Sequence, residues 1–311
     1  MSTVDEKKLL VTLDDSRRAV DTVRYLAQMP SFSRMQLHFF HTFAGVPETY
    51  WDLQREPSAL KNVSALHAWE TQHRAAIEKH LEKCRDILLA HDVHPKNIHV
   101  HIRKRKRGVA RDIIAEAAKG YEAVVLRRRG LTRLQSLVMG STALKLLNGL
   151  TGIPLVFAGR MPGNPRVLIA CDGSNNALRA VDFAGKTLVP GHHTVIVASV
   201  MRTYAIDDLA EEAPATVKNL TQMPLDVLQQ KLEEAVDKLR NRGFAADAVE
   251  TRIVTEAVSR AGTIVELAEK EEAGTIVVGR RGHSKVREFA IGRVSSKILQ
   301  LSSGQAVWVV N

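Results

Sequence analysis

Cysteine is scarce in this sequence, and long apolar runs are missing. The chain of 311 residues has two cysteines, and one falls in each half. Secreted proteins stabilised by disulfides need more of them, so we expect a reduced, cytoplasmic protein. No apolar run reaches the roughly 18 residues of a membrane helix, so we expect no membrane span. The first residues, MSTVDEKKLLVTL, carry acids before their lysines and no long apolar core, so we expect no signal peptide.

The stretch 279–296 carries the strongest local signal, and it reads GRRGHSKVREFAIGRVSS with glycines spaced G-x-x-G-x9-G. An apolar run typical of a buried strand precedes it, and an amphipathic run typical of a helix follows from residue 294. A strand, a Gly-rich loop and a helix N-terminus can bind phosphate, because glycines admit an anion close to the backbone and the first helical N–H groups donate to it. The spacing fits neither a P-loop nor a Rossmann fingerprint.

A second copy of this stretch lies upstream, so the chain is an internal duplication. Residues 127–143 read RRRGLTRLQSLVMGSTA. Gly130 and Gly140 are ten residues apart, as are the last two glycines of the other copy, and the copies are offset by 152 residues. Arg127 stands where the downstream copy has its first glycine.

Each copy alternates predicted strands with predicted helices. The predicted strands are 8–13, 35–43, 97–102, 123–126 and 154–158, then 167–171, 193–201, 248–254, 274–278 and 306–310. The predicted helices are 16–28, 63–91, 109–119 and 142–150, then 174–186, 215–242, 261–271 and 294–301. This alternation implies parallel sheets with helices on both faces. We therefore predict an α/β fold of two tandem five-stranded domains, 1–158 and 166–311, joined by a linker at 159–165 that contains two prolines and two glycines.

An aspartate follows the first predicted strand of each copy, Asp14 in one and Asp172 in the other. Ligands of open α/β sheets bind outside the carboxyl ends of the strands, so each copy is expected to place an acid and a Gly loop at the same edge. The alternative is that these aspartates cap the following helix or shape the turn. Ser16 is the expected N-cap of the first helix.

These features resemble the universal stress protein family in its tandem two-domain form. The resemblance rests on the starts LLVTLDDS and VLIACDGS, on the strand and its G-x-x-G-x9-G loop, and on the closing strand IPLVF, and it covers nearly the whole chain. It implies Rossmann-like domains. Many members of the family bind ATP or AMP, whereas others bind no nucleotide and act in regulation or stress tolerance.

The resemblance also implies a pairing of the two halves. In the family the last strand pairs with its counterpart across a dimer. Here the strands 154–158 and 306–310 are therefore expected to pair within one chain as a pseudo-dimer, with Trp308 near the seam. Two such chains could in addition form a homodimer.

In members that bind ATP, the acid after the first strand contacts the adenosine, and the loop amides and a Ser or Thr after the third glycine contact the phosphates. The resemblance implies a second-half site at Asp172, Gly279, Gly282, Gly292 and Ser295. It implies a first-half site at Asp14, Gly130, Gly140 and Ser141. The only metal expected is the Mg²⁺ that a nucleotide brings with it.

Both halves depart from the ATP-binding pattern. Arg293 takes the place of the small hydroxyl residue after the third glycine, where it could crowd the phosphates or lie over them as a cation. In the first half, the side chain of Arg127 can block the close approach of an anion, and Ala143 stands where the other half has Ser295. We therefore expect nucleotide binding in the second half more than in the first.

The net charge of +10 is divided unevenly: residues 1–159 carry +9 and residues 160–311 carry +1. Two basic runs, Arg103–Arg107 and Arg127–Arg129, follow the third and fourth predicted strands and hold eight cations at one edge. They could bind a polyanion, such as RNA, DNA, a phosphorylated metabolite or an anionic lipid, or an acidic protein partner. The alternative is a solvated face, which the absence of interleaved aromatic residues favours.

Other candidate sites are weaker. His99 and His101 share one face of a strand, but a metal site needs a third donor, so we expect packing or surface histidines. His283 and Ser284 are adjacent without an orienting acid, so no hydrolase triad is expected. No general base is apparent, so any enzyme activity would be slow ATP hydrolysis at most. The sequence thus predicts a regulatory nucleotide-binding protein; the alternative is an interaction protein that binds no nucleotide and uses its basic first half.

Overall fold

A computed structural model describes residues 7–46, 60–127, 140–159, 165–201, 215–255, 257–282 and 291–311. In these ranges the strands form one sheet in the order β3-β2-β1-β4-β5-β10-β9-β6-β7-β8. The strands are β1 (Lys8–Thr12), β2 (Gln36–Phe43), β3 (Ile98–Lys104), β4 (Ala123–Arg127), β5 (Leu155–Ala158), β6 (Arg166–Ala170), β7 (Thr194–Val200), β8 (Val249–Val254), β9 (Thr275–Gly279) and β10 (Ala306–Val310). Neighbouring strands are parallel except β5 and β10, which are antiparallel with Val156 opposite Trp308. The predicted pseudo-dimer within one chain is confirmed.

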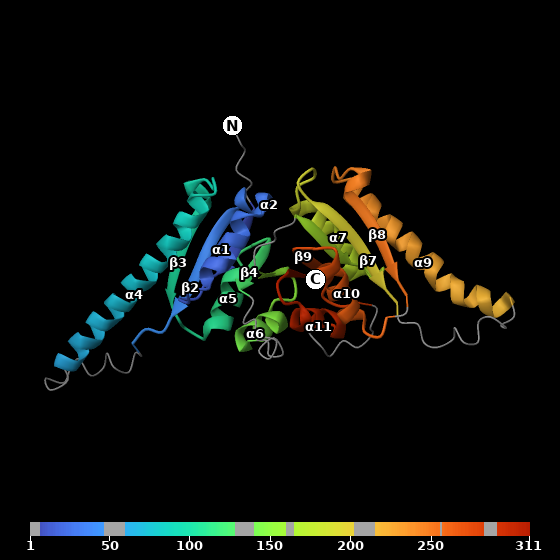
Figure 1. Cartoon of the computed structure of the whole chain (residues 1–311). Helices are drawn as coiled ribbons and strands as arrows, with labels where there is room; N and C mark the ends of the chain where they lie inside the picture. The colour runs from blue at the N-terminus through green and yellow to red at the C-terminus, as the bar shows by residue number, and fades with distance from the viewer. Residues whose placement is uncertain are drawn as a thin grey trace.

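Helices cover both faces of this sheet, and α4 and α9 run diagonally outward from its opposite ends (Figure 1). The helices are α1 (Ala19–Ala27), α2 (Pro30–Ser33), α4 (Leu60–Leu89), α5 (Val109–Ala117), α6 (Ser141–Gly149), α7 (Asn175–Thr187), α9 (Ala215–Arg240), α10 (Arg260–Lys270) and α11 (Arg293–Leu301), with 3₁₀ turns η2 (Pro95–Asn97) and η3 (Ala246–Ala248). The short α2 is not predicted from the sequence, because four residues are too few to show a helical period. No helix within the described ranges is both long and apolar enough to cross a bilayer.

Two hydrophobic cores lie on opposite faces of the sheet. The first core packs α1, α4, α7 and α9 against one face, and the second packs α5, α6, α10 and α11 against the other. Side chains alternate along a strand, so Leu9 and Val11 of β1 enter the first core while Leu10 between them enters the second. Both faces of the strands are thus apolar, which explains why the strands read as continuous apolar runs.

The predicted helix 16–28, with Ser16 as its N-cap, is wrong at its start. The helix α1 begins at Ala19, and its N-cap residue makes no side-chain hydrogen bond. The Ser16 hydroxyl instead donates to the Asp14 carboxylate at 2.5 Å. The equivalent helix α7 is capped as expected for a serine, because the hydroxyl of Ser174 accepts a hydrogen bond from the backbone of its first turn.

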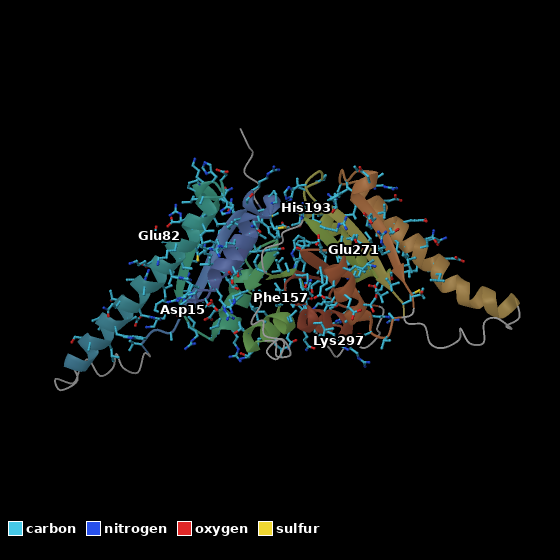
Figure 2. The ribbon with its side chains drawn as sticks, in the orientation of Figure 1. Asp15, Glu82, Phe157, His193, Glu271 and Lys297 are labelled. Carbon is cyan, nitrogen blue, oxygen red and sulfur yellow. The ribbon has the colours of Figure 1, made fainter. Side chains whose placement is uncertain are left out.

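Aromatic side chains fill the seam between the two halves. Trp308 of β10 is fully buried, and its Nε1 donates to the hydroxyl of Tyr25 at 2.8 Å. Its ring lies 5.5 Å from that of Phe32 in the first half and 5.7 Å from that of Phe183 in the second. Figure 2 places Phe157 of β5 at the centre of the molecule, where the halves meet. The predicted position of Trp308 at the seam is confirmed.

We predict that Tyr25→Phe lowers the free energy of unfolding by about 1–3 kcal/mol, because the buried Trp308 N–H loses its acceptor. Burial raises the pKa of Tyr25 to about 12, so the hydroxyl is neutral at ordinary pH, and the substitution removes this bond and a longer contact of 3.5 Å with the Thr275 hydroxyl. Urea denaturation measures the effect. In a Trp308→Phe background the same substitution should cost less, since no donor is left unpaired. Equal costs in both backgrounds would show that the hydrogen bond contributes nothing.

Candidate functional site

The two ends of the Gly loop in the second domain are tied together. The Gly292 N–H donates to the carbonyl of Arg280 at 2.8 Å, and the Ser295 hydroxyl donates to the carbonyl of Gly279 at 2.7 Å. The end of β9 is therefore fixed beside the start of α11. Residues 283–290 in the middle of the loop, with the adjacent His and Ser considered for a triad, lie outside the described residues.

Two glycines of this loop are required by close approaches. A Cβ atom on Gly279 would lie 2.7 Å from the carbonyl carbon of Asn176 and 2.8 Å from the nitrogen of Ala177, in the first turn of α7. A Cβ atom on Gly282 would collide with the Asp172 carboxylate. Gly279 thus lets α7 pack against β9, and Gly282 lets the loop backbone approach Asp172.

Asp172 follows β6 at the carboxyl edge of the sheet. Its Oδ1 accepts a hydrogen bond from the Ser174 N–H at 3.0 Å, and the intervening Gly173 has a φ of 76°, which a glycine adopts without strain. The carboxylate is exposed and lines a cavity. Asp172 therefore shapes the turn and also faces this cavity. A structural role in the turn and a role in binding a ligand are compatible for this residue.

The cavity has a volume of about 1100 Å³. Part of its wall is apolar and comes from Val200 at the end of β7, Leu228 of α9 and Ile264 of α10. Another part is basic and comes from Lys231, Arg260, Arg281, Arg293 and Lys297. Lys297 lies on α11 at the lower side of the molecule in Figure 2. Among the described lining residues, Asp172 is the one carboxylate. Such a wall suits a ligand that combines an apolar ring with several negative charges.

The first turn of α11 borders this cavity through Arg293, Val294 and Ser295. Helix geometry leaves their backbone N–H groups without an intrahelical acceptor, and no described residue accepts them. The Arg293 side chain is exposed. Ser295 is only 4% exposed and its hydroxyl is committed to Gly279, so it can offer a ligand its backbone N–H rather than the hydroxyl that the resemblance implies.

The equivalent position in the first domain is filled by the protein's own side chains. Arg127 Nη1 donates to the Ser16 hydroxyl at 2.7 Å and lies 3.4 Å from Asp14 Oδ2. The guanidinium therefore neutralises the carboxylate that the resemblance assigns to adenosine. Only 19% of the Arg127 side chain is exposed, compared with 54% for Asp14, so the arginine lies beneath the acid.

The other residues considered at the first site lie around the start of α6. Gly140 is the N-cap of α6 and Ser141 is its first residue, as their positions in the repeat imply. Ala143 lacks the hydroxyl with which Ser295 fixes the end of β9. Gly130 lies outside the described residues. In the part of this site that the structure describes, the hydroxyl tie between strand and helix is thus missing.

The two histidines considered for a metal site, His99 and His101 on β3, meet a third, His38 on β2. The ring of His38 stacks on those of His99 and His101, with centroids 4.5 and 5.1 Å away, and shares a hydrogen bond of 2.9 Å with His101. Stacked rings do not aim their nitrogens at one point. Over the described ranges, no three His, Cys, Asp or Glu side chains are arranged to hold a metal ion.

Comparison with known proteins gives a consistent result. The model described as "Universal stress protein family" matches residues 6–151 and 163–311. A universal stress protein from Mycolicibacterium smegmatis is 26% identical over 311 residues, which cover 95% of this chain and 94% of that protein. The solved structure of a universal stress protein from Archaeoglobus fulgidus covers 98% of both chains with a TM-score of 0.62 at 18% identity. A solved structure from Pseudomonas aeruginosa covers 98% of this chain and 93% of its own, with a TM-score of 0.58 at 16% identity. Both structures share the fold of this chain.

We predict that Gly279→Ala lowers the free energy of unfolding by about 1–3 kcal/mol, because the added methyl group forces the first turn of α7 away from β9. Chemical denaturation followed by circular dichroism measures the change. Gly152→Ala is the matched control, since no atom lies within 4 Å of its added Cβ. The control should change stability by about 0.5 kcal/mol or less. If both variants lost a similar amount of unfolding free energy, the loss in Gly279→Ala would not come from the close approach of α7 to β9.

We also predict that stability falls as the pH drops from about 6.5 toward 4, the interval between the ordinary pKa of histidine and that of folded His38. Burial, then the nearby charges of His99 and His101, lowers the pKa of His38 to about 4. In this window His38 binds a proton in the unfolded chain but not in the folded chain, and this difference favours unfolding. In His38→Phe the unfolding free energy should fall less across this window; His193, whose pKa burial also lowers to about 4, accounts for a remaining fall. The control His91→Phe, at an exposed histidine, should leave the profile as it is.

Proposed function

Because the chain belongs to the universal stress protein family in its tandem two-domain form, we propose that its second domain binds an adenine nucleotide, ATP or AMP. The role that follows is regulatory rather than catalytic, with the bound state read by a partner during the stress response. The observation that supports this proposal is the contrast between the repeats. Asp172 faces an open cavity, whereas Asp14 is held by Arg127. The first domain is therefore proposed to bind no nucleotide.

Each part of the nucleotide has a proposed counterpart in the cavity wall. Asp172 would accept hydrogen bonds from ribose hydroxyls, because an ionised carboxylate is an acceptor only. The apolar wall around Leu228 and Ile264 would bury the adenine ring. The N–H groups at the start of α11 would donate to the phosphates, where the helix dipole also favours negative charge. Any Mg²⁺ would be held chiefly by the phosphates, since the described wall adds one carboxylate.

Arg293 is proposed to act as a cation over the phosphates rather than as an obstacle. Its side chain is exposed, and Lys297 lies one turn further along the same face of α11. Arg281 lines the same cavity from the other end of the loop. Since each added phosphate brings negative charge to this wall, ATP should bind more tightly than AMP, and Arg293→Ala should reduce the difference.

A second candidate function is that of an interaction protein that binds no nucleotide and uses the first domain to meet an acidic partner. The observation that favours it is the exposure of all five cations of the run Arg103–Arg107. The two functions use different domains and can be tested separately.

We predict that Gly282→Val abolishes ATP binding while the protein stays folded, because a side chain there pushes the Asp172 carboxylate out of position. Isothermal titration calorimetry measures binding, and thermal unfolding checks the fold. Asp172→Ala should weaken binding about tenfold or more, as expected when a charged hydrogen-bond acceptor is removed. Its first-domain counterpart, Asp14→Ala, should bind ATP like the unmodified protein.

Mass spectrometry of small molecules released from the freshly purified, denatured protein gives an independent readout. Recovery of ATP, ADP or AMP supports the binding function. An empty extract, together with no heat of binding for added ATP, would contradict it. Unchanged ATP binding in Gly282→Val would show that the Gly loop takes no part in binding ATP.

A further inference from the structure

We propose that the carboxyl edge of the first domain binds single-stranded nucleic acid. The proposed surface, here called the basic–aromatic edge, consists of the run Arg103–Arg107 and the stacked pair Trp69 and His73. It lies in a different domain from the nucleotide cavity, so it does not depend on nucleotide binding. Its basis is a juxtaposition that the sequence does not reveal, because the cations lie at the end of β3 and just beyond it, whereas the aromatic pair belongs to α4.

The basic run has a fixed backbone and exposed side chains. The N–H of Arg105 donates to the carbonyl of Phe43 at 2.9 Å, which continues the pairing of β3 with β2. The N–H groups of Lys106 and Arg107 donate to the two carboxylate oxygens of Asp112 at 2.9 and 3.1 Å. All five cations of the run are exposed. A rigid backbone that projects exposed cations loses little entropy when phosphates bind to it.

An aromatic platform lies beside this run. Trp69 is 50% exposed, and its ring stacks on that of His73 with a centroid distance of 5.2 Å and an angle of 9°. The ring of His73 contacts Phe43 at the end of β2, 6.3 Å between centroids. No aromatic residue interleaves with the run in the sequence, but α4 brings an aromatic pair to the end of β2 from another part of the chain.

Glu70 of α4 holds the platform and the run together. Its carboxylate accepts the N–H of Val46 at 3.0 Å and lies 3.4 Å from Nζ of Lys104. These contacts hold this turn of α4 at the sheet edge that carries the cations, and the contacts of His73 with Trp69 and Phe43 place the aromatic pair at the end of β2. Figure 1 shows α4 extending past the end of β2 on this side of the molecule.

The second domain lacks this surface. Strand registers align Ile98 of β3 with Val249 of β8, because each pairs with the equivalent residue of the neighbouring strand. The run equivalent to Arg103–Arg107 is therefore 254–258, which reads VTEAV and contains no cation. The net charges of +9 and +1 in the two halves agree with this difference. The basic–aromatic edge is thus a feature of one repeat and not part of the fold that both share.

The chemistry of the edge fits a single strand better than other polyanions. Unpaired bases stack on exposed aromatic rings while the backbone phosphates lie along cations, and this combination is typical of proteins that bind single strands without sequence preference. A duplex keeps its bases stacked inside, so the indole would gain no partner there. Of the second basic run, Arg127 is already paired with Asp14, and Arg128 and Arg129 lie outside the described residues.

Fluorescence anisotropy with a labelled oligouridine of about 16 nucleotides tests the proposal. The full chain should bind it with an affinity that falls steeply as salt rises, because phosphate contacts release counterions. Trp69→Ala should lower the affinity about 5- to 150-fold and leave the salt dependence unchanged. The double variant Arg105→Glu/Arg107→Glu should lower the affinity and also flatten the salt dependence.

The matched control is the double variant Lys83→Glu/Lys96→Glu. It makes the same change in net charge at exposed lysines of the first domain that lie away from the edge, and it should bind like the unmodified chain. An equal loss in this control would show that binding follows net charge alone and would overturn the proposal. So would the absence of salt-dependent binding, an equal affinity for duplex with no effect of Trp69→Ala, or capture of anionic vesicles or an acidic peptide in place of the oligonucleotide.

Discussion

The antiparallel pairing of β5 with β10 determines most of this architecture. It joins two parallel sheets into one and buries Trp308 against Tyr25 at the seam. The same strands form the dimer in the family that the sequence resembles, so a homodimer of this chain would have to use another surface. The pairing also turns the carboxyl edges of both domains toward one side, where Figure 2 shows Asp15 and Lys297. The cavity beside Asp172 and the basic–aromatic edge therefore share a side of the molecule.

One repeat position accounts for much of the difference between the domains. A glycine at 279 lets α7 start close against β9, and this start aligns Ser174 as a cap and leaves Asp172 facing the cavity. In the first domain Arg127 stands at this position, and its guanidinium donates to the Ser16 hydroxyl. The guanidinium then pairs with Asp14. Arg127 thus engages both the carboxylate and the serine whose counterparts in the second domain are an open acid and a helix cap.

Most of the fold could be predicted from the sequence, because strand order and the repeat follow from periodic patterns and glycine spacing. The pseudo-dimer and the place of Trp308 also follow, once the family resemblance is recognised. The side-chain pairing of Arg127 with Asp14 could not be predicted, since it depends on a rotamer and a displaced helix. The approach of α4 to the basic run, through the contact of His73 with Phe43 and the ion pair of Glu70 with Lys104, could not be predicted either, because it depends on how α4 packs over the end of β2.

Arg280 connects the Gly loop to the seam. Its carbonyl accepts the Gly292 N–H, while its guanidinium donates to the carbonyl of Leu150 in the first domain and to the side chain of Asn311. Burial lowers its pKa to about 10, so it is still charged at neutral pH. A buried cation is costly unless its hydrogen bonds are made, and opening the seam would break the bond to Leu150. One residue therefore bonds both the Gly loop and the first domain, so a ligand that displaced Gly292 would disturb a residue that also holds a contact between the domains.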